Sequence, residues 1–468
     1  MNFRIHGVVR SLLAVACVGA SSVPAQTAIP DVSASSAYEH LKVLAGQIGE
    51  RTAGSEAEAR GAEYIASQFR SYGLKTTIEK FPIPTWREQR ARLWTDGGQV
   101  VDFPAKTVVF GGVTKPEGIV KDFVDIGAAS LRDVKSRELR DKIVLVRRDA
   151  EVDYPDYWLT DRLIPLGVAG MIFYSSPGRS AIPAIYFNYK RSLKEATPPS
   201  VEISYEDALR LVQMQPKKVG LVAVAETEWK ESQNIIGELT GSARPGELVL
   251  FSAHNDTAYS SPGAADDGGG VACVTELARA FSRGPRPART LRFIAWGAEE
   301  LGLIGSEAYL RAHESEIPKT VAMINYDGMG AALGVVGWVA AGADDWINFL
   351  HQTLAPAELE EPSSVGVSGT DSTNFGAVEV PNIDFSQRGD NGDSHTPRDN
   401  LQETSADGLA NGLLLAAMVG ERLAMDTNLT FSHEFPPEIL KEVRDYAARW
   451  GWGVRPEANL DPKPEPKK

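Results

Sequence analysis

Glu247-Leu-Val-Leu-Phe-Ser-Ala-His254 is the stretch that decides the fold, because an apolar, strand-like run ends there on a polar residue. The helical period from Val271 to Phe281 predicts a helix after an intervening loop. Arg289 to Trp296 again has the pattern of a buried strand, and it is followed closely by Glu299-Glu300. Open α/β sheets bind ligands beyond the carboxyl ends of their strands, so this strand, helix and strand predict a site at that edge.

The rest of the chain extends the same alternation of helices and strands. We therefore predict an α/β fold with a doubly wound, mixed sheet flanked by helices. Strand patterns cover residues 75–81, 320–326 and 381–385, and helical patterns cover 37–49, 56–72, 305–312, 343–354 and 404–423.

A change of character between residues 100 and 225 indicates an inserted domain. Short β-like runs such as Ile119 to Val124 and Gly170 to Tyr174 are separated there by frequent Pro and Gly. We predict a β-rich insert at 100–225 within a main domain formed by 26–99 and 226–430, followed by a partly disordered extension at 431–468. The alternative is that these strands belong to the main sheet.

The first 25 residues are predicted to be a signal peptide. Arg4 and Arg10 give a positive start, an apolar run follows, and small residues precede Gln26. A membrane anchor is the alternative, but the run is shorter than the roughly 20 residues that a spanning helix needs. Lipidation of Cys17 is a second alternative. No later segment could span a bilayer, so we expect a secreted or periplasmic protein.

Charge and cysteine content exclude other classes. The chain has 48 basic and 62 acidic side chains and a formal charge of -14, which argues against nucleic-acid binding. Its two cysteines are Cys17 and Cys273, and the first lies in the predicted signal peptide, so no intramolecular disulfide is expected in the mature chain.

Five separated residues are candidate metal ligands. Imidazole and carboxylate ligands without cysteine suit zinc or a similar divalent ion, and five are more than one tetrahedral ion needs. Two ions that share one carboxylate would use all of them. Taken singly, such residues are more often ordinary loop or turn residues, but here they follow predicted strands or lie in polar loops. The candidates are His254, Asp266, Glu300, Asp327 and His395.

The order of these motifs resembles the two-zinc metallopeptidases of family 28, which include secreted aminopeptidases and plasma glutamate carboxypeptidase. His254-Asn-Asp256, Asp266-Asp-Gly-Gly-Gly270 and Glu299-Glu300 are similar to the motifs of that family, in the same order. The resemblance runs from the turn at Arg51 to the last long helix. It implies the zinc-peptidase fold and two zinc ions per chain.

The same resemblance implies a role for each motif around the bridging ligand. Asp266 would bridge the ions, His254 would bind one of them, and Asp256 would orient that imidazole. Family members often have a cis peptide bond after the bridging Asp. Gly269 departs from the usual Ser of the motif, which leaves Asp267 open as an alternative bridge.

The remaining roles complete the site by resemblance. Glu299 would be the general base that takes the proton of a hydroxide-forming water between the ions, and Glu300 and Asp327 would be terminal ligands. His395 would be the second imidazole. Asp371 resembles an acid of a loop near the pocket, with a supporting role or a contact to substrate.

The implied activity is hydrolysis of a peptide bond at a chain end, with an aminopeptidase as the first expectation and peptides as the partner. A dipeptidase or a glutamate carboxypeptidase-like enzyme is the alternative. From other classes, an inactive receptor-like binding protein, as the transferrin receptor is, and a single-zinc glutaminyl cyclase also belong to related folds. The insert resembles a protease-associated domain at Lys142 to Val146, Gly167 to Phe173 and Pro199 to Ser204, and such a domain would frame the cleft.

Overall fold

The computed structural model describes most of the chain after residue 29. The described residues are 30–127, 134, 137–147, 163–175, 181–187, 189–192, 196–359, 363–389 and 394–449. The predicted signal peptide and the tail from Arg455 lie outside them. Within these ranges, none of the helices has both the length and the apolar character needed to cross a membrane.

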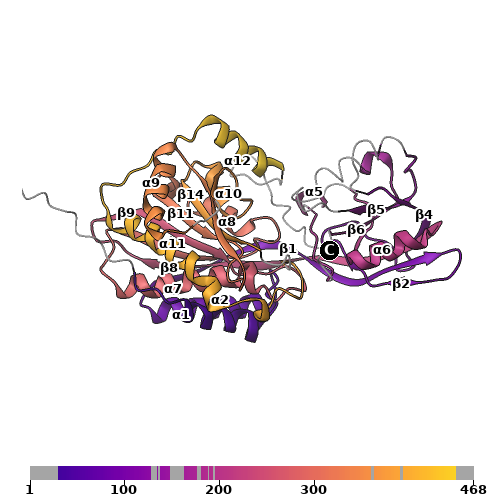
Figure 1. Cartoon of the computed structure of the whole chain (residues 1–468), viewed down its shortest axis with the longest axis horizontal. Coiled ribbons are helices and arrows are strands. Elements are labelled where there is room, and N and C mark those ends of the chain that lie inside the picture. Colours follow the sequence, from indigo (N-terminus) through magenta and orange to yellow (C-terminus); the bar gives the residue numbers. More distant parts are fainter. Residues whose placement is uncertain are drawn as a thin grey trace, which may run out of the picture.

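Two bodies joined by a long two-stranded ribbon make up the molecule (Figure 1). Strand β1 (Lys75–Asp96) pairs with β8 (Lys218–Leu239) along its whole length, from Lys75 opposite Glu238 to Asp96 opposite Lys218. We call residues 97–217, which lie between the far ends of these strands, the inserted lobe, and the rest the main lobe. The predicted strand at 75–81 is thus the first part of a longer strand, because β8 pairs with β1 as far as Asp96.

The main sheet runs in the order β13-β12-β14-β11-β9-β10-β8. Strands β10 and β11 both pair in parallel with β9, so the carboxyl ends of these three strands meet at one edge. The sheet is mixed because β8 runs antiparallel to β10, and β12 runs antiparallel to β14. The bounds are β9 (Arg244–His254), β10 (Arg289–Trp296), β11 (Thr320–Tyr326), β12 (Val335–Ala341), β13 (Ser363–Val365) and β14 (Asn382–Arg388).

Helices cover both faces of this sheet, as the doubly wound pattern predicts. Alternate residues of β9 point to opposite faces: Val249 and Phe251 join one apolar cluster, whereas Leu248 and Leu250 join another. Figure 1 shows α1, α2 and α7 along one side of the main lobe and α8 and α10 toward the other. The helices are α1 (Ala34–Leu41) with its continuation η1 (Lys42–Ile48), α2 (Glu56–Ser71), α7 (Gly269–Arg283), α8 (Ile304–Ala312), α9 (Asp344–Leu354), α10 (Ser372–Ala377), α11 (Ala406–Met425) and α12 (Pro437–Arg449).

The inserted lobe is rich in short strands, and it is hydrogen-bonded to the main sheet through β8. Ile119 pairs with Leu221, so the first long strand of the lobe continues the sheet along the outer half of the ribbon. Parallel strands then follow, with Val144, Met171 and Phe173 in their core. The elements are β4 (Ile119–Asp125), β5 (Ile143–Arg147), β6 (Gly170–Tyr174), β7 (Ser200–Ile203) and α6 (Tyr205–Met214), with the short β2 (Asp102–Phe103), β3 (Lys106–Thr107) and α5 (Tyr189–Ser192).

Candidate metal centre

Three of the predicted ligands lie at or shortly beyond the carboxyl ends of parallel strands. His254 is the last residue of β9, Glu300 follows β10, and Asp327 is the first residue after β11. Asp266 lies in the turn η3 (Ala264–Gly268) that leads into α7. His395 comes from a loop beyond β14. The parallel register of the three strands brings residues together that are up to 73 positions apart, as in the hydrogen bond from Ser252 to Asn325.

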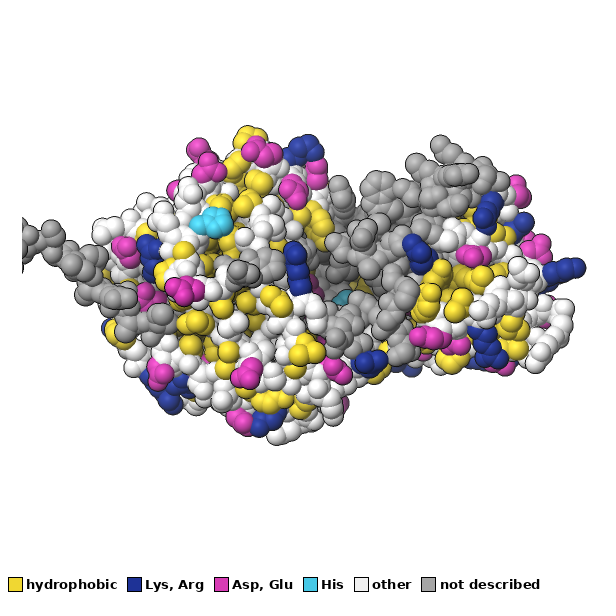
Figure 2. Space-filling view, viewed as in Figure 1, with side chains coloured by type: hydrophobic (Ala, Val, Ile, Leu, Met, Phe, Trp, Pro, Cys, Tyr) yellow, Lys and Arg dark blue, Asp and Glu magenta, His cyan; other side chains and the backbone are white. Residues whose placement is uncertain are grey.

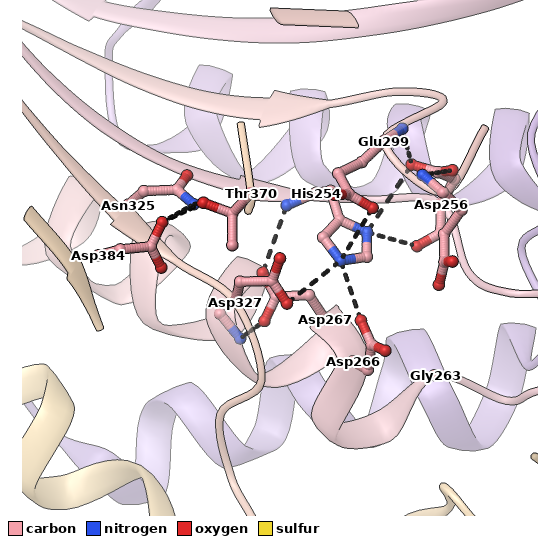
Figure 3. A network of polar contacts seen from close by, with 12 residues as sticks. His254, Asp256, Gly263, Asp266, Asp267, Glu299, Asn325, Asp327, Thr370 and Asp384 are labelled. Atoms are coloured by element: carbon pink, nitrogen blue, oxygen red, sulfur yellow. Dashed lines mark hydrogen bonds and ion pairs between the residues drawn. The ribbon is translucent and has the colours of Figure 1, made fainter. Parts of the chain in front are cut away.

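The imidazole of His254 is buried among carboxylates (Figure 3). Its Nε2 lies 3.0 Å from Asp266 Oδ1 and 3.9 Å from Asp327 Oδ1. The Glu299 carboxylate lies 3.9 Å from the same nitrogen. Three carboxylates therefore face one ring nitrogen.

A second group of side chains meets the other oxygen of Asp266. His395 Nε2 lies 3.3 Å from Asp266 Oδ2 and 3.2 Å from Glu300 Oε2. The ligand atoms of His254, Asp266 and Asp327 all lie within 4.8 Å of one another, as do those of Asp266, Glu300 and His395. The structure thus brings all five predicted ligands together in two groups that share Asp266.

The hydrogen-bonding pattern of this cluster leaves lone pairs directed at a position that a cation could occupy. The Nδ1 of His254 lies 3.0 Å from the main-chain oxygen of Asp256, which can only accept, so Nδ1 carries the proton of the neutral ring. Nε2 then presents a lone pair to the Asp266 carboxylate, an arrangement that a positive ion between them would stabilise. Glu300 Oε1 is buried and has no hydrogen-bond partner among the described residues. Nitrogen and oxygen donors without sulfur suit zinc.

The pKa shifts report how crowded the carboxylates are. Burial, with the nearby Asp266, raises the pKa of Glu300 to about 8. Burial and the Asp327 charge raise the pKa of Glu299 well above its usual range. Burial would also raise the pKa of Asp266, but the adjacent imidazoles of His254 and His395, when protonated, would hold it well below its usual range. Bound cations would favour the ionised form of every one of these acids.

Asp256 holds the Glu pair more directly than it holds His254. Its carboxylate accepts hydrogen bonds from the main-chain N–H of Glu299 at 3.0 Å and of Glu300 at 3.3 Å. The distance from that carboxylate to His254 Nδ1 is 3.8 Å, so the imidazole is oriented by the main-chain oxygen of Asp256 instead. The side chain expected to orient the imidazole thus fixes the turn that carries the predicted base and ligand.

The geometry favours Asp266 over Asp267 as the shared ligand. The two oxygens of Asp267 accept hydrogen bonds from the main-chain N–H of His254 at 3.3 Å and of Gly270 at 3.0 Å, which directs this carboxylate to the main chain. The peptide bond between Asp266 and Asp267 is cis, as the resemblance implies.

Arg51 and Asp399 support the site and were not among the predicted site residues. The guanidinium of Arg51 is fully buried. It donates hydrogen bonds to main-chain oxygens of the segment just before it and of the loop between His254 and Asp266. Burial lowers its pKa to about 10. Asp399 accepts the main-chain N–H groups of Ala265 at 2.7 Å and Asp266 at 3.1 Å. The acceptors of the Arg51 side chain are Leu44, Gly49, Asn255, Pro262 and Gly263.

Asp371 lies near the same edge and is buried. Its Oδ1 has no hydrogen-bond partner among the described residues, and burial raises its pKa to about 8. The loop before it is held by Asp384, whose carboxylate accepts hydrogen bonds from Ser372 Oγ at 2.9 Å and from Thr370 (Figure 3). This arrangement leaves the supporting or substrate-contacting role of Asp371 as a prediction.

Known proteins resemble this chain over most of its length. Residues 234–419 match the family model described as Peptidase family M28. Aminopeptidase YwaD of Bacillus subtilis is 27% identical over 479 residues, which cover 93% of this chain and 96% of that protein. Carboxypeptidase Q of Rattus norvegicus is 29% identical over 315 residues, which cover 62% of this chain and 64% of that protein.

Solved structures share the fold described above. A zinc aminopeptidase from Bacillus subtilis has a TM-score of 0.71 and 24% identity, covering 87% of this chain and 100% of that one. A peptidase M28 precursor from Shewanella amazonensis has a TM-score of 0.75 and 24% identity, covering 86% of this chain and 96% of that one. The predicted α/β architecture is confirmed.

Proposed function

We propose that the chain is a zinc-dependent exopeptidase of peptidase family M28, and specifically an aminopeptidase, because residues 234–419 match the model of that family. The observation that carries this proposal is the pair of ligand groups that share the Asp266 carboxylate, with Glu299 beside them. A single-zinc site or a metal-free binding site would not need two such groups.

Two zinc ions are proposed, one held by His254, Asp266 and Asp327 and the other by Asp266, Glu300 and His395. When bound, the ions polarise the scissile carbonyl and make water acidic enough to attack it at neutral pH. Asp266 keeps the two groups at a fixed separation, because one carboxylate oxygen faces each of them.

Glu299 is proposed as the group that moves the proton. It takes a proton from the attacking water and delivers it to the amine that leaves. Its pKa is raised by burial, which suits a carboxylate that must hold a proton for part of the cycle. The hydrogen bond from its main-chain N–H to Asp256 fixes the turn, while its side chain points into the cluster (Figure 3).

The choice of the amino terminus rests on how far each relative matches. The similarity to the aminopeptidase spans 96% of that protein, whereas the similarity to carboxypeptidase Q spans 64% of that one. A dipeptidase or a carboxypeptidase remains the alternative within the same chemistry. We further propose that residues 1–25 are a signal peptide, that the protein is secreted or periplasmic, and that the inserted lobe is a protease-associated domain.

In Figure 2, acidic and basic side chains are interspersed over the described surface, so this face does not gather the basic side chains that a polyanion would need. The binding test is to measure zinc content by mass spectrometry after dialysis of the purified chain. The activity test compares three matched peptides: one with free ends, one with a blocked amino terminus and one with a blocked carboxyl terminus.

An aminopeptidase with two zinc equivalents cleaves the first and third peptides, leaves the second intact and loses activity with a chelator. Cleavage of the second peptide but not the third would replace this proposal with a carboxypeptidase. A dipeptidase would cleave only an unblocked dipeptide. A chain that binds no zinc and cleaves none of them would contradict the proposal altogether.

A further inference from the structure

The inserted lobe reaches the ligand cluster at His395. The main-chain N–H of Ala184 donates a hydrogen bond of 2.8 Å to the main-chain oxygen of His395. The ring of Tyr186 meets the imidazole edge to face, with ring centroids 5.8 Å apart and an angle of 80° between the planes. Both the main chain and the ring of this predicted ligand are therefore in contact with the other lobe.

Tyr186 is itself held in place from both lobes. Its hydroxyl accepts a hydrogen bond of 2.9 Å from the main-chain N–H of Tyr259, which follows His254 in the main lobe. Within the inserted lobe, the main-chain N–H groups of Val109 and Phe187 bond to Ile185 and Val109 oxygens, each at 2.8 Å. The tyrosine ring is thus a fixed surface against which the imidazole packs.

A buried ion pair docks the lobe at a second point. Lys190 Nζ of α5 lies 3.1 Å from Glu307 Oε2 of α8, and the two side chains are only 8% and 5% exposed. Helix α8 begins four residues after Glu300. Glu307 also pairs with Arg311 of its own helix, so undocking the lobe would leave the buried Glu307 with one of its two cationic partners, and the pair with Lys190 favours the docked position.

His395 needs such support more than the other predicted ligands do. His254 ends a strand in the middle of the sheet, where the ladder fixes its main chain. His395 lies in a loop and has a φ of +61°, which is unusual for a residue with a side chain. The orientation of its ring toward Asp266 and Glu300 must come from tertiary contacts.

We propose that the inserted lobe completes the metal centre, with Tyr186 as a positioning residue for His395. Docking of the lobe and binding of zinc at Asp266, Glu300 and His395 are then linked, because the same contact serves both. Among the described contacts, those of the inserted lobe with the cluster are made to His395. Zinc binding by His254, Asp266 and Asp327 should therefore not depend on docking of the lobe. This inference rests on the proposed two-ion function and adds a role for a lobe that otherwise only frames the site.

The test measures zinc binding rather than turnover. Wild type, Tyr186→Ala and Tyr186→Phe are titrated with zinc in competition with a chromophoric chelator, and circular dichroism and melting temperature establish that each is folded. Tyr205→Ala is the matched control, because Tyr205 packs on Tyr174 in the same lobe, away from His395. Lys190→Met is a second variant that loosens the docked lobe without touching the ligand cluster.

We expect wild type, Tyr186→Phe and Tyr205→Ala to bind two equivalents with the same affinities. Tyr186→Ala and Lys190→Met should bind one equivalent as wild type does and the other roughly 10-fold or more weakly, as is typical when the support of a ligand is removed. If wild type binds two ions and both Tyr186→Ala and Lys190→Met match it, this inference fails while the proposed function stands. If wild type binds fewer than two ions, the proposed two-ion function fails and this inference fails with it.

Discussion

The carboxylate of Asp256 accepts the main-chain N–H of Glu299 at 3.0 Å, and its other oxygen accepts that of Glu300 at 3.3 Å. Asparagine at position 256 would have the same shape, but its NH₂ group would face one of these two N–H groups. Asp256→Asn should therefore lower kcat/KM roughly 10- to 100-fold. Asp122→Asn, an exposed change in the inserted lobe, is the control and should have no effect.

Alanine substitutions of the adjacent Glu299 and Glu300 should impair the protein in different ways. Glu299→Ala is expected to lower kcat by roughly 10²- to 10⁴-fold while two zinc equivalents remain bound, because it removes only the proton carrier. Glu300→Ala should lose zinc as well, because Glu300 Oε2 faces His395 in the second ligand group. Zinc analysis and steady-state rates on both variants check this, and near-normal turnover by Glu299→Ala would show that another group is the base.

Even the conservative replacement of Arg51 by lysine should destabilise the folded protein. Its side chain donates to five main-chain oxygens, whereas an ammonium group has only three N–H groups. Arg51→Lys should leave buried oxygens without donors and lower the free energy of unfolding by roughly 2–5 kcal/mol. Denaturant unfolding measures this, and Arg60→Lys on the exposed face of α2 is the control. A variant as stable as the wild type would mean that the hydrogen bonds of the Arg51 side chain contribute little to the free energy of unfolding.

Acid should destabilise the fold partly through His40. This side chain is 8% exposed, with Nδ1 at 2.7 Å from the Tyr64 hydroxyl, and burial lowers its pKa from 6.5 to about 4. Between pH 6.5 and 4 the unfolded chain binds a proton that the folded chain does not, so stability is lost as the pH falls through this window. At pH 5 the difference amounts to about 2 kcal/mol.

The comparison of wild type with His40→Gln isolates that contribution. Other buried acids titrate in the same range, but they are common to both proteins and cancel in the difference. The unfolding free energy of the wild type, relative to the variant, should fall as the pH decreases from 7 to 5. A difference that is constant with pH would contradict the assigned pKa.

The parts of the site that follow strands could be predicted from the sequence. A buried strand has a recognisable apolar run, so the polar residue that ends it, such as His254 or Asp327, is visible without a structure. Residues that act through the main chain of distant segments carry no such signal. Arg51 is one example, because its acceptors depend on the path of the loop around it, and Tyr186 is another, because it comes from the other lobe.

The fold was less predictable where contacts with a neighbouring strand or helix, rather than the local sequence, determine the secondary structure. The middle of β1 contains Pro82 and Pro84, which gave no strand pattern, yet it is extended because β8 lies beside it throughout. Strand β12 and helix α12 were not predicted. Their stability comes from packing on β14 and α10, which the local pattern does not report.

The ribbon of β1 and β8 also determines how the inserted lobe can move. The chain leaves the main lobe on β1 and returns on the neighbouring β8. The conformational entropy lost in closing this long insertion therefore adds little to the cost of folding the main lobe. The lobe can tilt only if both strands bend together, and the irregular pairing at Glu88 and Arg90 is the natural pivot. Bending at this pivot would move Ala184 and Tyr186 relative to His395, the predicted metal ligand that they contact.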